Sequence, residues 1–124
     1  METLTKREEE IMQIIWKLKK GFVKDFVNLL PAPKPAYNTV STIVRILEKK
    51  GFIDHTAYGT TYEYFPVVSK LAYKKYAFKK LISNYFEGAP ENVVSFMINE
   101  DQIGEPEIRE IKDIIEEAER KMKS

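Results

Sequence analysis

Apolar positions in the first thirty residues recur at the spacing of two amphipathic helices. One helical face is formed by four residues at i, i+3, i+4 and i+7: Ile11, Ile14, Ile15 and Leu18. Thr5 and Glu8 precede it as a capping box, and Lys19-Lys20-Gly21 is typical of a helix end. A second set has the same spacing: Val23, Phe26, Val27 and Leu30. Three prolines, at 31, 33 and 35, prevent that helix from continuing.

A third helix and a β-hairpin are predicted between residues 37 and 66. The helix opens near Tyr37-Asn38, closes at Lys50-Gly51, and has one apolar stripe: Val40, Ile43, Val44 and Leu47. Residues 52–56 and 61–65 are rich in strand formers, Tyr58-Gly59 between them indicates a turn, and Pro66 closes the pair. Three helices followed by a hairpin are the layout of a winged helix-turn-helix.

The remaining chain predicts three more helices. Ser69 is a candidate cap for a long helix that ends near residues 88–90, and a short helix follows over 93–98. Pro106 suits the first turn of a last helix. The apolar residues of this last helix alternate at spacings of three and four, as in a heptad stripe: Ile108, Ile111, Ile115, Ala118 and Met122.

These tail helices carry more apolar surface than a small winged helix can cover, so we expect a homodimer. The residues expected to make dimer contacts lie on the long and the last helix: Leu71, Phe78, Ile82, Tyr85, Ile108, Ile111, Ile115 and Met122. The expected fold is therefore mainly α with a small β-hairpin. Residues 1–67 form a winged-helix DNA-binding domain, and residues 68–124 form a helical dimerisation domain.

DNA binding is predicted from the polar side of the third helix, where a second stripe is spaced at i, i+3, i+4 and i+7: Asn38, Ser41, Thr42 and Arg45. Exposed helix faces usually carry Glu, Lys and Gln, and short polar residues are poorer helix formers. Short side chains can approach base edges in the major groove, and an Arg can contact guanine with two hydrogen bonds. Two other interpretations stay open: these residues are simply tolerated on a solvent face, or Asn38 is only an N-cap.

The hairpin tip offers backbone amides, hydroxyls and a phenol that could reach phosphates: Tyr58, Gly59, Thr60 and Thr61. The alternative is a purely structural hairpin. Tyr62 and Tyr64 point to one side of their strand, and we expect them to pack on the body of the domain. His55 is expected to be a surface strand residue rather than a ligand or a pH sensor.

Composition and charge narrow the classes of function. The chain has no Cys and one His, which excludes disulfides and thiolate sites and leaves little for a metal centre, so no metal and no cofactor are expected. The net charge of +1 divides into +2 for residues 1–66, +4 for 67–90 and −5 for 91–124. A basic body suits a polyanion, although solvated helix faces explain the asymmetry equally well. No apolar run could span a membrane and no signal peptide is visible, so a cytoplasmic protein is expected.

Two other classes of function were compared with DNA binding. An enzyme needs a clustered nucleophile, base or metal set. The dense carboxylates, residues 8–10 and 116–119, read as solvated helix faces, so no enzymatic activity is expected. A winged helix used only for protein interaction is the stronger alternative. Its docking surface would be rich in large apolar or aromatic residues, unlike the face with Ser41, Thr42 and Arg45.

The stretch YNTVSTIVRILEKKGFI, residues 37–53, resembles the penicillinase repressor / methicillin-resistance repressor family of winged-helix transcriptional repressors. The resemblance continues at both sides of this stretch: Leu4-Thr5, Glu9, Ile14-Ile15-Trp16, Tyr62-Glu63-Tyr64-Phe65-Pro66 and Ser69. It implies a homodimeric repressor on a palindromic double-stranded DNA operator, with entwined tail helices. By position, Thr39, Ser41 and Thr42 fall where the family touches DNA, and better-known members commonly have Arg in place of Ser41.

The same resemblance implies a route of inactivation. Members of the family are often cleaved in the dimerisation tail, just before a phenylalanine that usually follows Asn; here the matching bond is Ser95-Phe96. The implied partner is a sensor or membrane metalloprotease. The family is also similar in outline to copper-responsive repressors, which carry tail cysteines. This chain has none, so copper sensing does not carry over.

Overall fold

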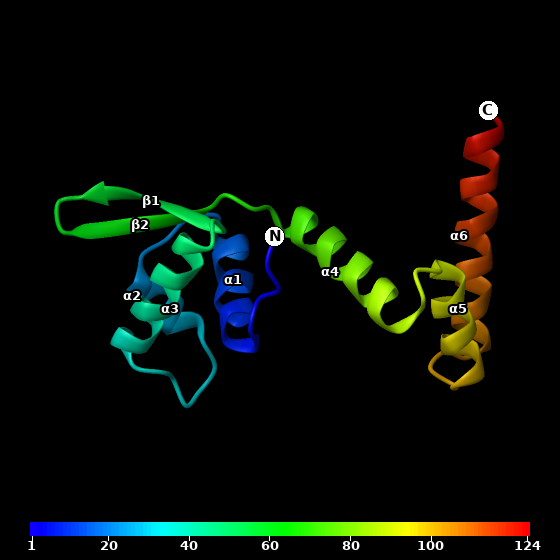
Figure 1. Ribbon diagram of the computed structural model, residues 1–124, viewed down its shortest axis with the longest axis horizontal. Coiled ribbons are helices and arrows are strands. Elements are labelled where there is room, and N and C mark those ends of the chain that lie inside the picture. Colours follow the sequence, from blue (N-terminus) through cyan, green and yellow to red (C-terminus); the bar gives the residue numbers. More distant parts are fainter. The chain divides into compact units, whose positions relative to one another are not determined.

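The computed structural model describes residues 1–124, which form two compact units, residues 1–77 and 78–124. The first unit contains three helices and a hairpin: α1 (Lys6–Leu18), α2 (Val23–Leu29), α3 (Tyr37–Lys49), β1 (Ile53–Tyr58) and β2 (Thr61–Pro66). The hairpin extends from the helical body that α1, α2 and α3 form (Figure 1). This arrangement confirms the predicted winged helix-turn-helix.

The long helix α4 (Lys70–Tyr85) starts in the first unit and runs into the second, which also contains α5 (Pro90–Asn99) and α6 (Glu105–Lys123). Ser69 caps α4 as predicted, because its hydroxyl accepts a hydrogen bond from the Ala72 amide at 3.0 Å. The mainly α fold class is therefore confirmed, while the functional division at residue 67 stays a prediction. No helix is both long and apolar enough to cross a membrane.

The core of the first unit is built from the stripes that periodicity predicts. Val40, Val44 and Leu47 of α3 are fully buried, and Ile43 lies half-buried at the edge of the stripe. They pack with apolar residues of α1, α2 and the hairpin: Ile11, Met12, Ile15, Phe26, Phe52 and Ile53. This packing fixes which side of α3 faces outward.

The hairpin is attached to the body at its base. The pairing Tyr58↔Thr61 leaves Gly59 and Thr60 as the turn, one residue later than predicted, because Gly59 is the residue that takes the required positive φ of 65°. At the other end, Gly21 and Tyr64 exchange two backbone hydrogen bonds, at 3.0 and 2.7 Å. Nothing in the sequence pattern predicts this bridge.

The capping box of α1 also makes a long-range ion pair. The Thr5 hydroxyl accepts from the Glu8 amide at 3.2 Å, and the Glu8 carboxylate accepts from the Thr5 amide at 2.8 Å. Both carboxylate oxygens of the buried Glu8 lie 3.0 Å from the Lys50 ammonium, at the end of α3. Burial acts to raise the pKa of Glu8, but the Thr5 amide and Lys50 outweigh it and lower that pKa below its ordinary value of 4.5.

We predict that Glu8 makes the free energy of unfolding of the first unit depend on pH in the acidic range. A lowered folded-state pKa means that ionised Glu8 stabilises the fold above pH 4.5, and that this stabilisation is lost as the pH falls through the lower folded value. Glu8→Gln should cost roughly 1–3 kcal/mol at pH 7 and less at pH 3, where the unfolded chain holds this carboxyl protonated. Urea unfolding at both pH values measures this, with the exposed neighbour Glu9→Gln as control. Equal losses at both pH values would contradict the prediction.

Candidate nucleic-acid interface

The outer face of α3 carries the residues predicted to read DNA. Asn38, Thr39, Thr42 and Arg45 are exposed, and Ser41 is half-buried. The helix begins at Tyr37 with Ala36 as its N-cap, so Asn38 lies inside the first turn. The interpretation of Asn38 as only an N-cap is therefore wrong, because the helix begins one residue before it and Ala36 is the N-cap.

Two side-chain hydrogen bonds order this face along the helix. The Thr42 hydroxyl donates to the Asn38 carbonyl at 2.9 Å, and an Arg45 guanidinium nitrogen donates to the Ser41 hydroxyl at 3.3 Å. A guanidinium has five N–H donors, so the bond to Ser41 orients Arg45 and leaves most of its donor capacity for a ligand. Ser41 thus supports Arg45, besides any contact of its own.

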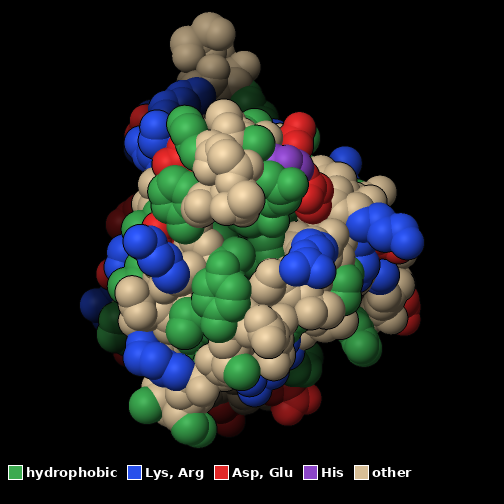
Figure 2. All heavy atoms as spheres, turned by 90° about the vertical axis from the view of Figure 1, so that its left-hand side faces the viewer, with side chains coloured by type: hydrophobic (Ala, Val, Ile, Leu, Met, Phe, Trp, Pro, Cys, Tyr) green, Lys and Arg blue, Asp and Glu red, His purple; other side chains and the backbone are tan.

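A cleft of about 460 Å³ separates α3 and the start of α2 from the hairpin. It brings together five of the predicted DNA-binding residues: Asn38, Ser41, Arg45, Thr60 and Thr61. The other four, Thr39, Thr42, Tyr58 and Gly59, are exposed but do not line the cleft. In Figure 2, which views this unit toward the hairpin tip, Lys and Arg side chains are spread around an apolar hollow.

The cleft also contains residues that the sequence analysis missed: Phe22, Val23, Lys24, Tyr37, Tyr62 and Tyr64. Lys24 matters most for DNA binding, because it and Arg45 are the two cationic residues that line the cleft. Its place in the first turn of α2 is a signal that could have found it, since the first helix of a helix-turn-helix crosses the DNA backbone.

The tyrosines of the hairpin, which is the wing of the fold, differ in how far they are buried. Tyr64 is buried as predicted, and burial, together with the nearby Glu48 carboxylate, raises the pKa of its phenol. For Tyr62 the prediction of packing on the body is wrong, because its side chain is 44% exposed and lines the cleft. Tyr62 shares the strand face of Tyr64 but lies farther from the Gly21 bridge, toward the tip. At the tip itself, the exposed Tyr58 ring lies 6.4 Å from that of Phe22.

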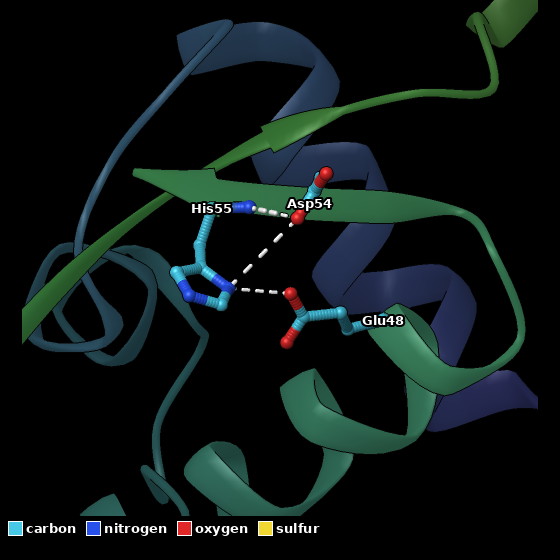
Figure 3. Close-up of side chains that lie close together, drawn as sticks. All are labelled: Glu48, Asp54 and His55. Atoms are coloured by element: carbon cyan, nitrogen blue, oxygen red, sulfur yellow. Dashed lines mark hydrogen bonds and ion pairs between the residues drawn. The ribbon is translucent and has the colours of Figure 1, made fainter. Parts of the chain in front are cut away.

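His55 lies on strand β1 as predicted, but its side chain is only partly exposed and contacts two carboxylates. Its side chain is 28% exposed, and its Nδ1 lies 2.5 Å from the Glu48 carboxylate of α3 and 3.9 Å from that of Asp54 (Figure 3). Asp54 also accepts a hydrogen bond from the His55 amide at 2.8 Å. The ligand atoms of the three residues lie within 4.8 Å of one another, so they could hold a divalent cation. Hydrogen bonding among them also accounts for the grouping.

Comparison with known proteins decides the family. The sequence model of the penicillinase repressor family matches residues 4–117, which is nearly the whole chain. The chain belongs to the penicillinase repressor family. It is 25% identical over 113 residues to the methicillin resistance regulatory protein MecI of Staphylococcus aureus strain N315, covering 90% of this chain and 92% of that protein. It is also 25% identical over 117 residues to the penicillinase repressor of Bacillus licheniformis, covering 94% and 91%.

Membership in the penicillinase repressor family confirms the resemblance that the motifs indicate. The match includes the winged helix and most of the tail, so it is not limited to a shared DNA-binding fold. The family is one of transcriptional repressors.

Proposed function

We propose that two copies of this chain bind a palindromic operator as a repressor, with α3 in the major groove and the hairpin on the adjacent backbone. The observation that carries the proposal is the cleft, where the polar face of α3 meets the hairpin tip and the cations Lys24 and Arg45. Short polar side chains suit base edges, and cations with hydroxyls suit phosphates. We assign base contacts to Asn38, Thr39, Ser41, Thr42 and Arg45, and phosphate contacts to residues 58–61.

Dimerisation is proposed through the apolar stripes of the tail. Leu71, Phe78 and Tyr85 of α4 are 57%, 51% and 76% exposed, although all three are large and apolar or aromatic. On α6, Ile108, Ile115 and Met122 are exposed and Ile111 is half-buried. Large apolar side chains that repeat along one face of a helix are costly to leave in water, so a second copy is their natural cover. Ile82 is only 5% exposed within its own chain, so its part in the contact is indirect.

Release from DNA is proposed to follow cleavage of the bond between Ser95 and Phe96. Both residues are exposed, and the bond lies inside α5. Along the sequence it separates the proposed contacts on α4 from those on α6. The Phe96 ring makes an edge contact with Phe86 at 5.6 Å. A protease needs an extended segment, so α5 must open locally before a sensor or membrane metalloprotease can cut it.

The proposal predicts specific and salt-dependent DNA binding. In a gel-shift assay, the full chain should shift DNA from upstream of its own coding sequence in preference to a mixed-sequence duplex of equal length. The affinity should fall steeply and linearly with log salt, because each phosphate contact releases a counterion. Equal affinity for both duplexes would contradict sequence-specific binding, and no shift at low salt would favour the protein-interaction module instead.

A further inference from the structure

We propose that His55 is a positioning residue that fixes the wing against the recognition helix α3, so that both reach DNA as one surface. This inference rests on the proposed function, which does not itself assign any role to His55. Two observations support it: the cluster of Glu48, Asp54 and His55 in Figure 3, and the way in which the hairpin is attached to the body.

The backbone attaches the hairpin only near its base. The Gly21–Tyr64 bridge and the hydrogen bonds from the Val67 and Val68 amides to the Phe52 carbonyl all lie at that end. The base residues Phe52, Ile53 and Tyr64 are buried, whereas residues 56–62 are exposed. A two-stranded hairpin has little stability or direction of its own. The outer half of the wing must therefore be oriented by side chains.

His55 provides such a contact at the point where the hairpin leaves the body. On one side its Nδ1 contacts the Glu48 carboxylate of α3 at 2.5 Å. On the other side its ring stacks on Tyr62, with centroids 4.2 Å apart and planes within 20°. Tyr62 in turn lines the cleft together with Ser41 and Arg45. One imidazole thus connects α3, β1 and β2.

The physical consequence is a wing whose angle to α3 is set before DNA arrives. If the contact is lost, the hairpin tip samples more orientations, and binding must then order it. The loss should affect the contacts assigned to residues 58–61 and spare those made directly by α3. His55 itself need not touch DNA.

The first test needs no DNA, so it stands even if the proposed function fails. Hydrogen–deuterium exchange of the full chain is compared for the unmodified protein, His55→Ala and Thr56→Ala. Thr56 is the matched control, because it is the next residue of β1 and points to the opposite strand face. We expect exchange across residues 56–62 to become about tenfold faster in His55→Ala only, with α1 and α3 unchanged. Unchanged wing exchange in His55→Ala would overturn the inference.

The second test uses DNA and separates the two contacts of the ring. His55→Asn keeps an N–H near the Nδ1 position for Glu48, and His55→Phe keeps the stack on Tyr62. Affinity for the duplex from the gel-shift assay should fall roughly 5- to 20-fold in His55→Ala and recover partly in each of the other two variants. The salt slope should flatten by about one unit for each wing phosphate contact that is lost.

A double-mutant cycle completes the design. If His55 acts partly through Tyr62, the loss in the double variant His55→Ala/Tyr62→Ala should be smaller than the sum of the losses in the two single variants. Additive losses would show that the two residues act independently and would overturn the inference. If the unmodified chain binds no DNA, the proposed function fails, and the exchange experiment alone decides whether His55 positions the wing.

Discussion

Ending the chain after Ser95 is expected to weaken operator binding by a factor on the order of 10²–10⁴. The fragment keeps the winged helix and α4 but loses α6, with the exposed stripe of Ile108, Ile115 and Met122. Two linked half-site contacts then become two separate binding events, and the gain from linkage is lost. Gel shifts of fragment 1–95 and of the full chain on the same duplex measure this factor.

Sedimentation connects that loss to dimerisation. The full chain should sediment at micromolar concentration with twice the monomer mass of 14.5 kDa, and the fragment as a monomer. Ile115→Glu should reproduce both effects in the full-length chain, because a carboxylate is costly within an apolar contact. Asp113→Ala, outside the apolar stripe on the same helix, is the control. A fragment that held the operator as tightly as the full chain would exclude tail cleavage as the release step.

Replacing Arg45 by Ala is expected to cost about 1–3 kcal/mol of binding free energy per half-site if the guanidinium contacts a base, with relaxed preference at one position. A phosphate contact would instead weaken all sequences alike and flatten the salt slope by about one unit. Arg45→Lys separates the two roles, since it keeps the charge and loses the two-bond contact. Binding to a panel of operator variants at several salt concentrations measures both quantities.

Neighbouring residues of α3 supply the controls for Arg45. Ser41→Ala removes the hydroxyl that orients the guanidinium, so it should cost less than Arg45→Ala, and its effect should be smaller in the Arg45→Ala background, where only its own base contact is left to lose. Val44→Ala, on the fully buried side, should lower the melting temperature by destabilising the fold about 2 kcal/mol. If Arg45→Ala and Ser41→Ala both leave affinity unchanged in a folded protein, the recognition face has been misassigned.

The sequence by itself determined the local elements of this protein. The capping box at Thr5 and Glu8, the apolar stripe of α3 and the Ser69 cap all depend on residues within one or two helical turns. Interactions at such short separation follow from backbone geometry alone, so spacing predicts them. The sequence motifs also indicated the family, because they extend along nearly the whole chain.

Only the tertiary structure decided how separate elements combine. Lys24 and Arg45 meet at one cleft, Glu8 pairs with Lys50, and His55 joins Glu48 to Tyr62. Periodicity places each residue on a face of its own helix or strand, but it does not say which faces meet. That depends on how α1, α2, α3 and the hairpin pack around their common core, because burial of apolar area is non-directional and every element contributes to it. The spacing along α3 therefore predicted the polar outer face of the helix, whereas the packed core brought the wing to that face.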